Sequence, residues 1–281
     1  MKILINFANG AFKEQRKYNS LTGKKIGKFD KIIEFSPLDI EASFYGENWE
    51  ILGNSKGGGY WLWKPYFLLK TLNEAEYGDY IFYCDAGSYF VKPIDLLIEF
   101  AKANKEDMLI FEQPLLNVQY AKKEFIHELR LNNSEWAYEN LALAGFILVK
   151  KTTENLKFIE EYLNMCTSKS LISDPESGQR QHPEFISHRH DQTILSYLVW
   201  RNNIKMYRDI SQYGFLQAKY MRYGISKIGF SYVKVKKYQS CTYPTIVHLY
   251  RREKLYAFFP RMKFEFKLKI ELFLSKKVLG F

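Results

Sequence analysis

The chain has 281 residues, of which 47% are hydrophobic and 26% charged, a balance that supports a folded core and excludes general disorder. Its cysteines, Cys84, Cys166 and Cys241, show no CxxC spacing, which excludes a disulfide scaffold and a four-cysteine zinc site. No apolar run approaches the roughly 18 residues of a membrane span, and Asn6 and Asn9 interrupt the apolar run at the N-terminus, unlike a signal peptide. We therefore expect a cytoplasmic protein that is neither exported nor membrane-spanning.

The charge of the chain is uneven. Lysine and arginine number 41 against 31 aspartate and glutamate, a net charge of +10 that indicates an anionic partner. Residues 251–281 contain nine basic residues and three glutamates, so this tail carries +6 of the +10. The surplus is therefore mainly a property of the tail, which we treat separately from residues 1–250.

Short apolar runs predict six strands, which in chain order lie at 2–7, 31–35, 79–84, 108–111, 143–149 and 245–250. The segments between them predict helices within 10–28 and at 60–75, 93–103, 153–166 and 191–200. The polar stretch 167–190 predicts a long loop, which in compact domains is usually functional or mobile. Because strands alternate with helices, we predict an α/β domain over 1–250 whose largely parallel sheet has helices on both faces.

Asp85 directly follows the predicted strand at 79–84 and precedes Ala86 and Gly87. In open α/β sheets, ligands bind outside the carboxyl ends of the strands. A carboxylate there, followed by two small residues, can hold a divalent cation or a ribose hydroxyl while the backbone approaches a diphosphate. The alternative is an aspartate that caps the next turn, and the pattern leaves both open.

The segment GGGYWLWKP, residues 57–65, combines three glycines with the aromatic residues Tyr60, Trp61 and Trp63 and the cation Lys64. Glycines allow the backbone to approach a ligand, and flat rings give stacking surfaces. The segment matches neither a P-loop nor a GxGxxG dinucleotide motif. It therefore predicts a ligand-binding segment, with buried core tryptophans beside a flexible loop as the alternative.

Residues 182–198 place His188, His190 and Asp191 just before a predicted helix. The two histidines could converge on a ligand, although no zinc-binding spacing supports a metal there. Asp191 is well placed to cap the helix. A capping aspartate stays ionised near neutral pH, so it could also act as a general base toward an alcohol.

The order of these motifs, GGGYWLWKP, DYIFYCDAGSYF, LAGFILVK, HRHDQTILSYL and IVHLYRR, resembles bacterial glycosyltransferases of the GT-A fold that assemble surface polysaccharide and lipooligosaccharide. The resemblance implies a Rossmann-like sheet, a nucleotide-sugar donor, for which we expect a UDP-sugar, and a saccharide or lipid-linked acceptor. In that family a DxD motif binds Mn²⁺ or Mg²⁺. Here Asp85 resembles the first aspartate, Gly87 stands in place of the second, and His248 resembles a histidine that completes the metal site. A metal-independent enzyme is the alternative, with Lys56, Lys64, Arg251 or Arg252 stabilising the departing diphosphate.

The same resemblance implies roles for further residues. Those expected to bind the donor are Ala8, Asn9, Lys56, Tyr60, Trp61, Lys64, Asp85, Ala86, Gly87, Ala144 and Gly145. His188 and His190 are expected on the acceptor side, and Asp191 as the base that deprotonates the acceptor hydroxyl in an inverting transfer, which we favour. The alternative is a retaining transfer, in which Asp191 would have a positional role.

Residues 255–281 mix lysines with Phe, Leu and Ile, and apolar and charged residues nearly alternate over 262–274, which predicts a strand. Cationic segments with exposed aromatic residues suit the surface of an anionic bilayer, so we expect a peripheral protein at the inner face of the cell membrane. The alternatives are packing on the domain or on a second subunit, as in a homodimer. Two other classes stay open: a nucleic-acid-binding module, which lacks any recognised motif here, and a non-catalytic membrane adaptor.

Overall fold

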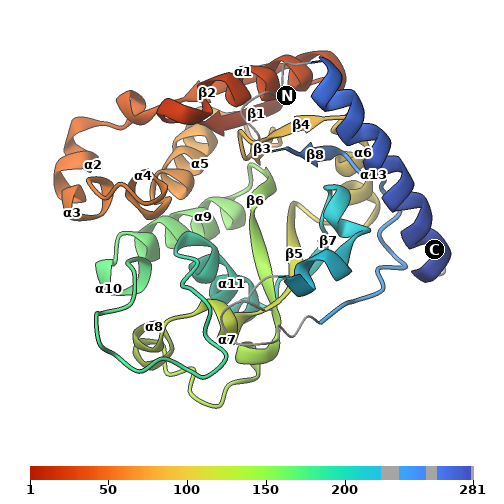
Figure 1. Cartoon of the computed structure of the whole chain (residues 1–281). Coiled ribbons are helices and arrows are strands. Elements are labelled where there is room, and N and C mark those ends of the chain that lie inside the picture. Colours follow the sequence, from red (N-terminus) through yellow and green to blue (C-terminus); the bar gives the residue numbers. More distant parts are fainter. Residues whose placement is uncertain (223–233, 251–257, 280–281) are drawn as a thin grey trace.

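The computed structural model describes residues 1–222, 234–250 and 258–279. Its centre is a six-stranded sheet in the order β2-β1-β3-β6-β5-β7 (Figure 1). The strands are β1 (Lys2–Phe7), β2 (Lys31–Phe35), β3 (Tyr80–Cys84), β5 (Met108–Leu116), β6 (Asn140–Lys150) and β7 (Met206–Arg208). Only β6 runs against its neighbours β3 and β5; the pairs β1–β2, β1–β3 and β5–β7 are parallel. The prediction of an α/β fold with a mostly parallel sheet is confirmed.

Helices cover both faces of this sheet because each strand sends alternate side chains to opposite sides. On β1, Ile3, Ile5 and Phe7 join one core cluster and Leu4 joins the other. The first face is covered by α5 (Trp63–Glu74), α9 (Thr153–Cys166) and α11 (Asp191–Arg201), and the second by α1 (Lys13–Thr22) and α6 (Asp95–Ala103) (Figure 1). The central strand β3, YIFYC, is therefore buried along its whole length, as expected for a strand covered on both sides.

Shorter elements complete the domain. A two-stranded antiparallel sheet pairs β4 (Ser88–Phe90) with β8 (Val247–Leu249), so the last predicted strand lies outside the main sheet. The short helices are α2 (Ala42–Glu47), α3 (Trp49–Leu52), α4 (Gly57–Tyr60), α7 (Asn117–Tyr120), α8 (Lys123–Glu128) and α10 (Lys169–Ile172). The predicted loop 167–190 is thus irregular apart from α10. Within the described residues, no helix combines the length and the hydropathy that crossing a bilayer requires.

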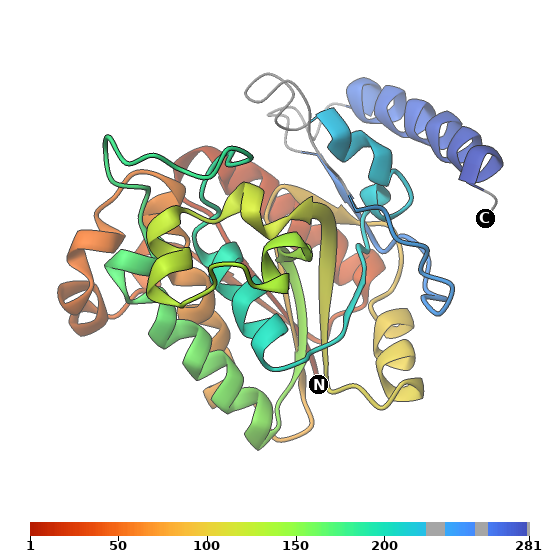
Figure 2. The ribbon, with the colours of Figure 1, turned by 90° about the horizontal axis from the view of Figure 1, so that it is seen from below.

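The tail contradicts one prediction, because 262–274 is not a strand but part of the helix α13 (Phe258–Leu279). Figures 1 and 2 show α13 at the periphery, beside β8 and the turns at 212–222. Apolar residues at every second position form two sets, and within each set the members are four residues apart. Residues four apart lie on the same side of a helix. Leu268 belongs to the set that is turned to the domain, and Phe266 belongs to the set that is exposed. The alternation is therefore compatible with a helix that is apolar on two sides.

Candidate functional site

A pocket of about 360 Å³ opens at the carboxyl ends of β1 and β3. The chain runs from β1 to β2 on one side of β1 and then crosses to β3 on the other side. Open α/β sheets bind ligands at such a switch point. We call it the β1–β3 pocket. Its lining residues are Phe7, Ala8, Asn9, Phe12, Ser55, Gly57, Gly58, Trp61, Trp63, Tyr83, Asp85, Ala86 and Gly87. The glycine–tryptophan segment and the DAG motif, predicted separately from the sequence, therefore line the same pocket.

The glycine–tryptophan segment takes an unusual backbone conformation. Five consecutive residues, 57–61, have positive φ angles of 62°, 60°, 95°, 50° and 64°. A Cβ on Gly57 would lie 2.4 Å from the Trp61 ring, and one on Gly58 would lie 3.0 Å from Asn9 Nδ2. The segment therefore needs glycine both for its backbone angles and for space. Since Tyr60 and Trp61 are left-handed, the helix predicted at 60–75 begins only at Trp63.

Trp63 fixes this segment against the end of β1. Its ring stacks on Phe7, with ring centroids 3.8 Å apart, and its Nε1 donates to the Gly57 carbonyl oxygen at 2.9 Å. Left-handed conformations in non-glycine residues cost roughly 1–2 kcal/mol each, so they persist where the surroundings enforce them. Trp63 forms one wall of the pocket and also belongs to the core. It therefore has both of the roles that the sequence left open, ligand binding and core packing.

Asp85 is oriented by residues on two neighbouring strands. The Tyr83 hydroxyl donates to Asp85 Oδ1 at 2.7 Å, and the Asp85 N–H donates to the Gly145 carbonyl oxygen at 2.9 Å. A Cβ on Gly145 would lie 3.0 Å from Asp85 Oδ2, so glycine there leaves room for the carboxylate. Burial and the neighbouring Asp85 hold the pKa of Tyr83 well above its usual range, which keeps the hydroxyl a donor. Sequence reasoning missed Tyr83, although its place two residues before Asp85 puts both on one side of the chain.

Lys64 and Asp191 form a buried ion pair behind the pocket. Their Nζ and Oδ2 atoms are 2.6 Å apart, and each side chain is 4% exposed. The Tyr162 hydroxyl donates to the same Oδ2 at 3.1 Å, and Lys64 Nζ lies 5.3 Å from the centroid of the Tyr83 ring. Burial raises the pKa of Asp191, and Lys64 acts against that rise. Asp191 was expected to face an acceptor hydroxyl, but its burial and pairing favour a positioning role.

His188 and His190 belong to the polar loop 173–190, and both are buried. His188 accepts from the Lys122 N–H at 3.4 Å and lies 2.8 Å from the Leu171 carbonyl oxygen. His190 lies 2.7 Å from the Ile172 carbonyl oxygen. Burial lowers the pKa of both histidines, that of His190 to about 4, so both are neutral at pH 7. Their surroundings indicate structural roles in holding the loop.

Tyr60 and Lys56 connect that loop to the glycine–tryptophan segment. The Tyr60 and His190 rings stack with centroids 4.8 Å apart, and His190 also stacks on Trp61 at 5.5 Å. Lys56 Nζ pairs with Asp174 Oδ1 at 2.5 Å. Neither Tyr60 nor Lys56 is among the residues that line the pocket. Their contacts therefore place them behind it, where they hold the left-handed segment against the loop.

His248, the second metal ligand predicted from the sequence, lies on β8 next to Tyr89 of β4. Its Nδ1 is 3.3 Å from the Tyr89 hydroxyl, and its ring contacts Phe264 of α13 edge-on at 6.2 Å. Burial lowers the pKa of His248 to about 4, so the imidazole is neutral, as metal binding requires. Within the described part of the chain, no three His, Cys, Asp or Glu side chains are clustered as a metal site.

The structure thus brings together Ala8, Asn9, Trp61, Asp85, Ala86 and Gly87 in one pocket, with Gly145 against Asp85. Ala144 is buried beside Gly145. Lys64 and Asp191 lie behind the wall, and Lys56, Tyr60, His188 and His190 lie further out. Arg251 and Arg252 fall outside the described residues.

No family model matches the chain, and no curated protein matches it by sequence. Its structure is similar to that of mouse xyloside xylosyltransferase 1, with a TM-score of 0.47 and 10% identity over 88% of this chain and 96% of that one. It is also similar to the galactosyltransferase LgtC, solved with donor and acceptor sugar analogues, with a TM-score of 0.42 and 13% identity over 89% and 87%. The glycosyltransferase GlyE of Streptococcus pneumoniae TIGR4 gives 0.39 and 11% over 90% of this chain and 55% of that one.

Proposed function

We propose that this chain is a glycosyltransferase of the GT-A type that moves a hexose from a UDP-sugar to a saccharide acceptor in cell-surface glycan synthesis. The observation that carries the proposal is the β1–β3 pocket, where Asp85 and the glycine–tryptophan segment meet at the switch point of the sheet. Ala8 and Asn9 at the end of β1 are placed to meet the base or ribose, and Gly145 to let the sugar lie against backbone.

The charges in the pocket support a metal-dependent enzyme. Asp85 is the one acidic residue among the described lining residues, and no lysine or arginine is among them. The lysines that could replace a metal are engaged elsewhere, Lys64 with Asp191 and Lys56 with Asp174. An anionic diphosphate that enters this pocket would bring its negative charge close to the Asp85 carboxylate. A divalent cation between them resolves this repulsion, and oxygen ligands of this kind suit Mg²⁺ or Mn²⁺.

In this proposal Asp85 holds the cation together with the diphosphate oxygens, and bound metal would stabilise the charge that develops on the leaving group. Tyr83 keeps the carboxylate in place through its hydrogen bond. The Nδ1 atom of His248 faces Tyr89, so Nε2 is the nitrogen that would serve as the second ligand. We propose an inverting transfer, in which a group other than the buried and paired Asp191 would have to take the proton of the acceptor hydroxyl. NMR spectroscopy of the product anomer tests whether the transfer inverts.

The first experiment is calorimetric titration of the full chain with UDP, with and without Mn²⁺. We expect Mn²⁺ to be required for tight binding and Asp85→Asn to weaken that binding about tenfold or more, since an amide binds cations more weakly than a carboxylate. Asp107→Asn is the matched control, because this exposed carboxylate precedes β5 at the opposite end of the sheet.

Each contrary result addresses a different part of the proposal. Equal affinity for UDP without Mn²⁺ and in Asp85→Asn would remove the metal from the proposal. If oligonucleotides alone stabilised the chain against thermal unfolding, and no nucleotide did, the chain would be a nucleic-acid-binding module and not an enzyme.

We further propose that α13 binds the protein to an anionic membrane where a lipid-linked acceptor resides. Over 258–279 the sequence has six basic residues and two glutamates. Both glutamates face the domain: Glu265 accepts from the Tyr89 hydroxyl at 3.2 Å, and Glu271 pairs with Lys219. The side exposed to solvent carries the apolar residues Met262, Phe266, Ile270, Phe273 and Leu274. An apolar stripe beside exposed lysines, with the acidic residues turned away, is typical of a helix that lies on anionic lipid.

Sedimentation with vesicles of phosphatidylcholine and phosphatidylglycerol tests this surface. Replacing Phe266 and Phe273 by serine should abolish most of the binding, because together they contribute much of the exposed stripe, while unfolding in urea should change little. Leu38→Ser is the control, since Leu38 is exposed far from α13 in the sequence. Undiminished sedimentation of the double variant, or equal binding to purely zwitterionic vesicles, would contradict the membrane role.

A further inference from the structure

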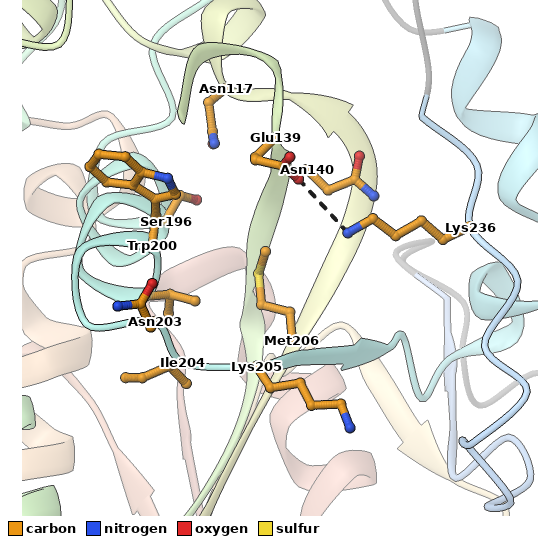
Figure 3. Close-up of a pocket in the computed structure, with 11 residues that line it drawn as sticks. Asn117, Glu139, Asn140, Ser196, Trp200, Asn203, Ile204, Lys205, Met206 and Lys236 are labelled. Carbon is orange, nitrogen blue, oxygen red and sulfur yellow. Dashed lines mark ion pairs between the residues drawn. The ribbon is translucent and has the colours of Figure 1, made fainter. Parts of the chain in front are cut away.

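A second pocket, of about 330 Å³, lies between the end of α11, the start of β6 and the strand β7 (Figure 3). We call it the Trp200 pocket. None of its lining residues lines the β1–β3 pocket. The two are linked through β6, because Asn140 lines the Trp200 pocket and Gly145 lies against Asp85. Five residues of strand span about 17 Å, so the pockets are separate sites.

One wall of the Trp200 pocket is apolar and the other polar. Trp200 is 38% exposed, and with Ile204 and Met206 it forms the apolar wall. Figure 3 shows Glu139 and Lys236 across from the Trp200 ring. An exposed indole face opposite hydrogen-bonding groups suits a ligand with one apolar face and several polar substituents.

The charged groups on the polar wall neutralise one another. Glu139 Oε1 pairs with Lys234 at 2.8 Å, and Lys236 pairs with Glu112 at 2.9 Å. Glu139 Oε2 and Lys236 Nζ are 3.9 Å apart, wider than a hydrogen bond. A hydroxyl placed between them can accept from the ammonium group and donate to the carboxylate. Lys205, the third charged lining residue, is exposed, and its Nζ lies 5.1 Å from the centroid of the Tyr207 ring. The paired charges of Glu139 and Lys236 give no advantage to an anion or a cation, so the wall across from Trp200 favours a neutral ligand.

Two buried amides, those of Asn117 and Asn140, also belong to this lining. Asn117 Nδ2 donates to the Trp136 carbonyl oxygen at 2.9 Å, and Asn140 Nδ2 donates to that of Lys234 at 3.1 Å. These partners fix the amide orientations, because a carbonyl accepts only from the nitrogen. Both Oδ1 atoms lack a donor among the described residues. A buried acceptor without a donor is costly, but both oxygens are closed to solvent, so the polar contacts open to a ligand come from Glu139 and Lys236.

We propose that the Trp200 pocket binds a neutral saccharide of one or two rings. A sugar ring presents a C–H face to stack on the indole and hydroxyls that both donate and accept. The pocket volume lies at the lower end of the roughly 300–1,000 Å³ of small-molecule sites. The proposal stands independently of the UDP-sugar site, since it concerns residues that the other pocket does not use.

Saturation-transfer NMR on the full chain tests this site, with methyl β-glucoside, methyl β-galactoside, lactose and maltose as probes at about 10 mM, suited to millimolar affinities. We expect transfer to at least one probe, loss of most of that signal in Trp200→Ala, and its retention in Trp200→Phe, which keeps an aromatic face. Trp49→Ala is the matched control, because Trp49 is exposed and lies outside both pockets. Addition of UDP with Mn²⁺ should leave the signal unchanged.

The proposal fails if no probe receives saturation, if Trp200→Ala gives the wild-type signal, or if UDP abolishes the signal. The last result would place the saccharide in the β1–β3 pocket instead. If no saccharide binds at Trp200 but UDP still binds, the transferase proposal stands and the proposal for the Trp200 pocket fails. If a saccharide binds but UDP does not, the Trp200 pocket proposal stands and the transferase proposal fails.

Discussion

At the scale of single residues, position along the chain indicates the surroundings of Asp85 better than those of Asp191. Asp85 follows a buried strand, and the end of a strand in an α/β sheet locates a side chain well. The pairing of Asp191 with Lys64 joins residues 127 positions apart, and no local pattern encodes it. A cap, a base and half of a buried ion pair all look alike in the sequence before a helix. Only the packing of α5 against α11 and α9 distinguishes them.

The ion pair makes Asp191 a structural residue as well as a neighbour of the site. Asp191→Asn should lower the free energy of unfolding by about 3–5 kcal/mol, because it leaves the Lys64 ammonium buried without its counter-charge. The double variant Lys64→Met with Asp191→Leu removes both charges and should recover most of that loss. Urea unfolding of the three proteins at pH 7 measures this. A loss below about 1 kcal/mol in Asp191→Asn would show that the pair does not hold the wall.

At the scale of elements, local pattern located most helices and strands but failed at 57–61 and in the tail. Helix propensity gives no sign that Tyr60 and Trp61 are left-handed, because side-chain contacts impose that conformation. These contacts come from Trp63, next to the segment, and from His190, far from it in the sequence. In the tail, the alternation predicts a strand, although apolar residues four apart equally form a stripe on a helix. The first error arises because tertiary contacts decide the backbone conformation. The second arises because one sequence pattern is compatible with both a strand and a helix.

Glycine substitutions can separate the two demands on the left-handed segment. Gly57→Ala adds a Cβ 2.4 Å from the Trp61 ring at a positive φ, whereas Gly178→Ala meets nothing within 4 Å at a φ of 83°. We expect Gly178→Ala to cost about 1 kcal/mol of stability from the backbone angle alone. Gly57→Ala should cost more and also weaken binding of UDP, because it displaces a pocket wall. Equal losses in thermal unfolding, with unchanged titration by UDP, would show that the segment does not shape the pocket.

At the scale of the whole molecule, alternating strands and helices predicted the layers of the fold but not the reversal of β6. An apolar run does not reveal its own direction, and the connection 117–139 between β5 and β6 is long enough for either a parallel crossover or an antiparallel return. The reversal matters for the site, since it presents Gly145 to Asp85 and carries Asn140 to the Trp200 pocket. The second pocket was not predictable, because its residues come from segments spread over 117–236.

Buried histidines on separate elements should make the whole fold sensitive to acid. The pKa of His190 falls to about 4 in the folded chain from a usual value near 6.5, so the unfolded chain takes up a proton first as pH decreases. His190 therefore stabilises the fold above pH 6.5 and loses that contribution toward pH 4, by about 2 kcal/mol between pH 7.5 and 5. His188 and His248 act in the same direction. Asp209 opposes them, because burial raises its pKa to about 6 and its protonation then favours the folded state.

Because these groups oppose one another, the informative quantity is the difference between variants. His190→Gln should reduce the fall in unfolding free energy between pH 7.5 and 5 by about 2 kcal/mol relative to the wild type. The exposed His182, replaced in the same way, controls for the substitution itself. Urea titrations at the two pH values give the comparison. If the wild type and His190→Gln fall equally, His190 is not held neutral by its burial in loop 173–190.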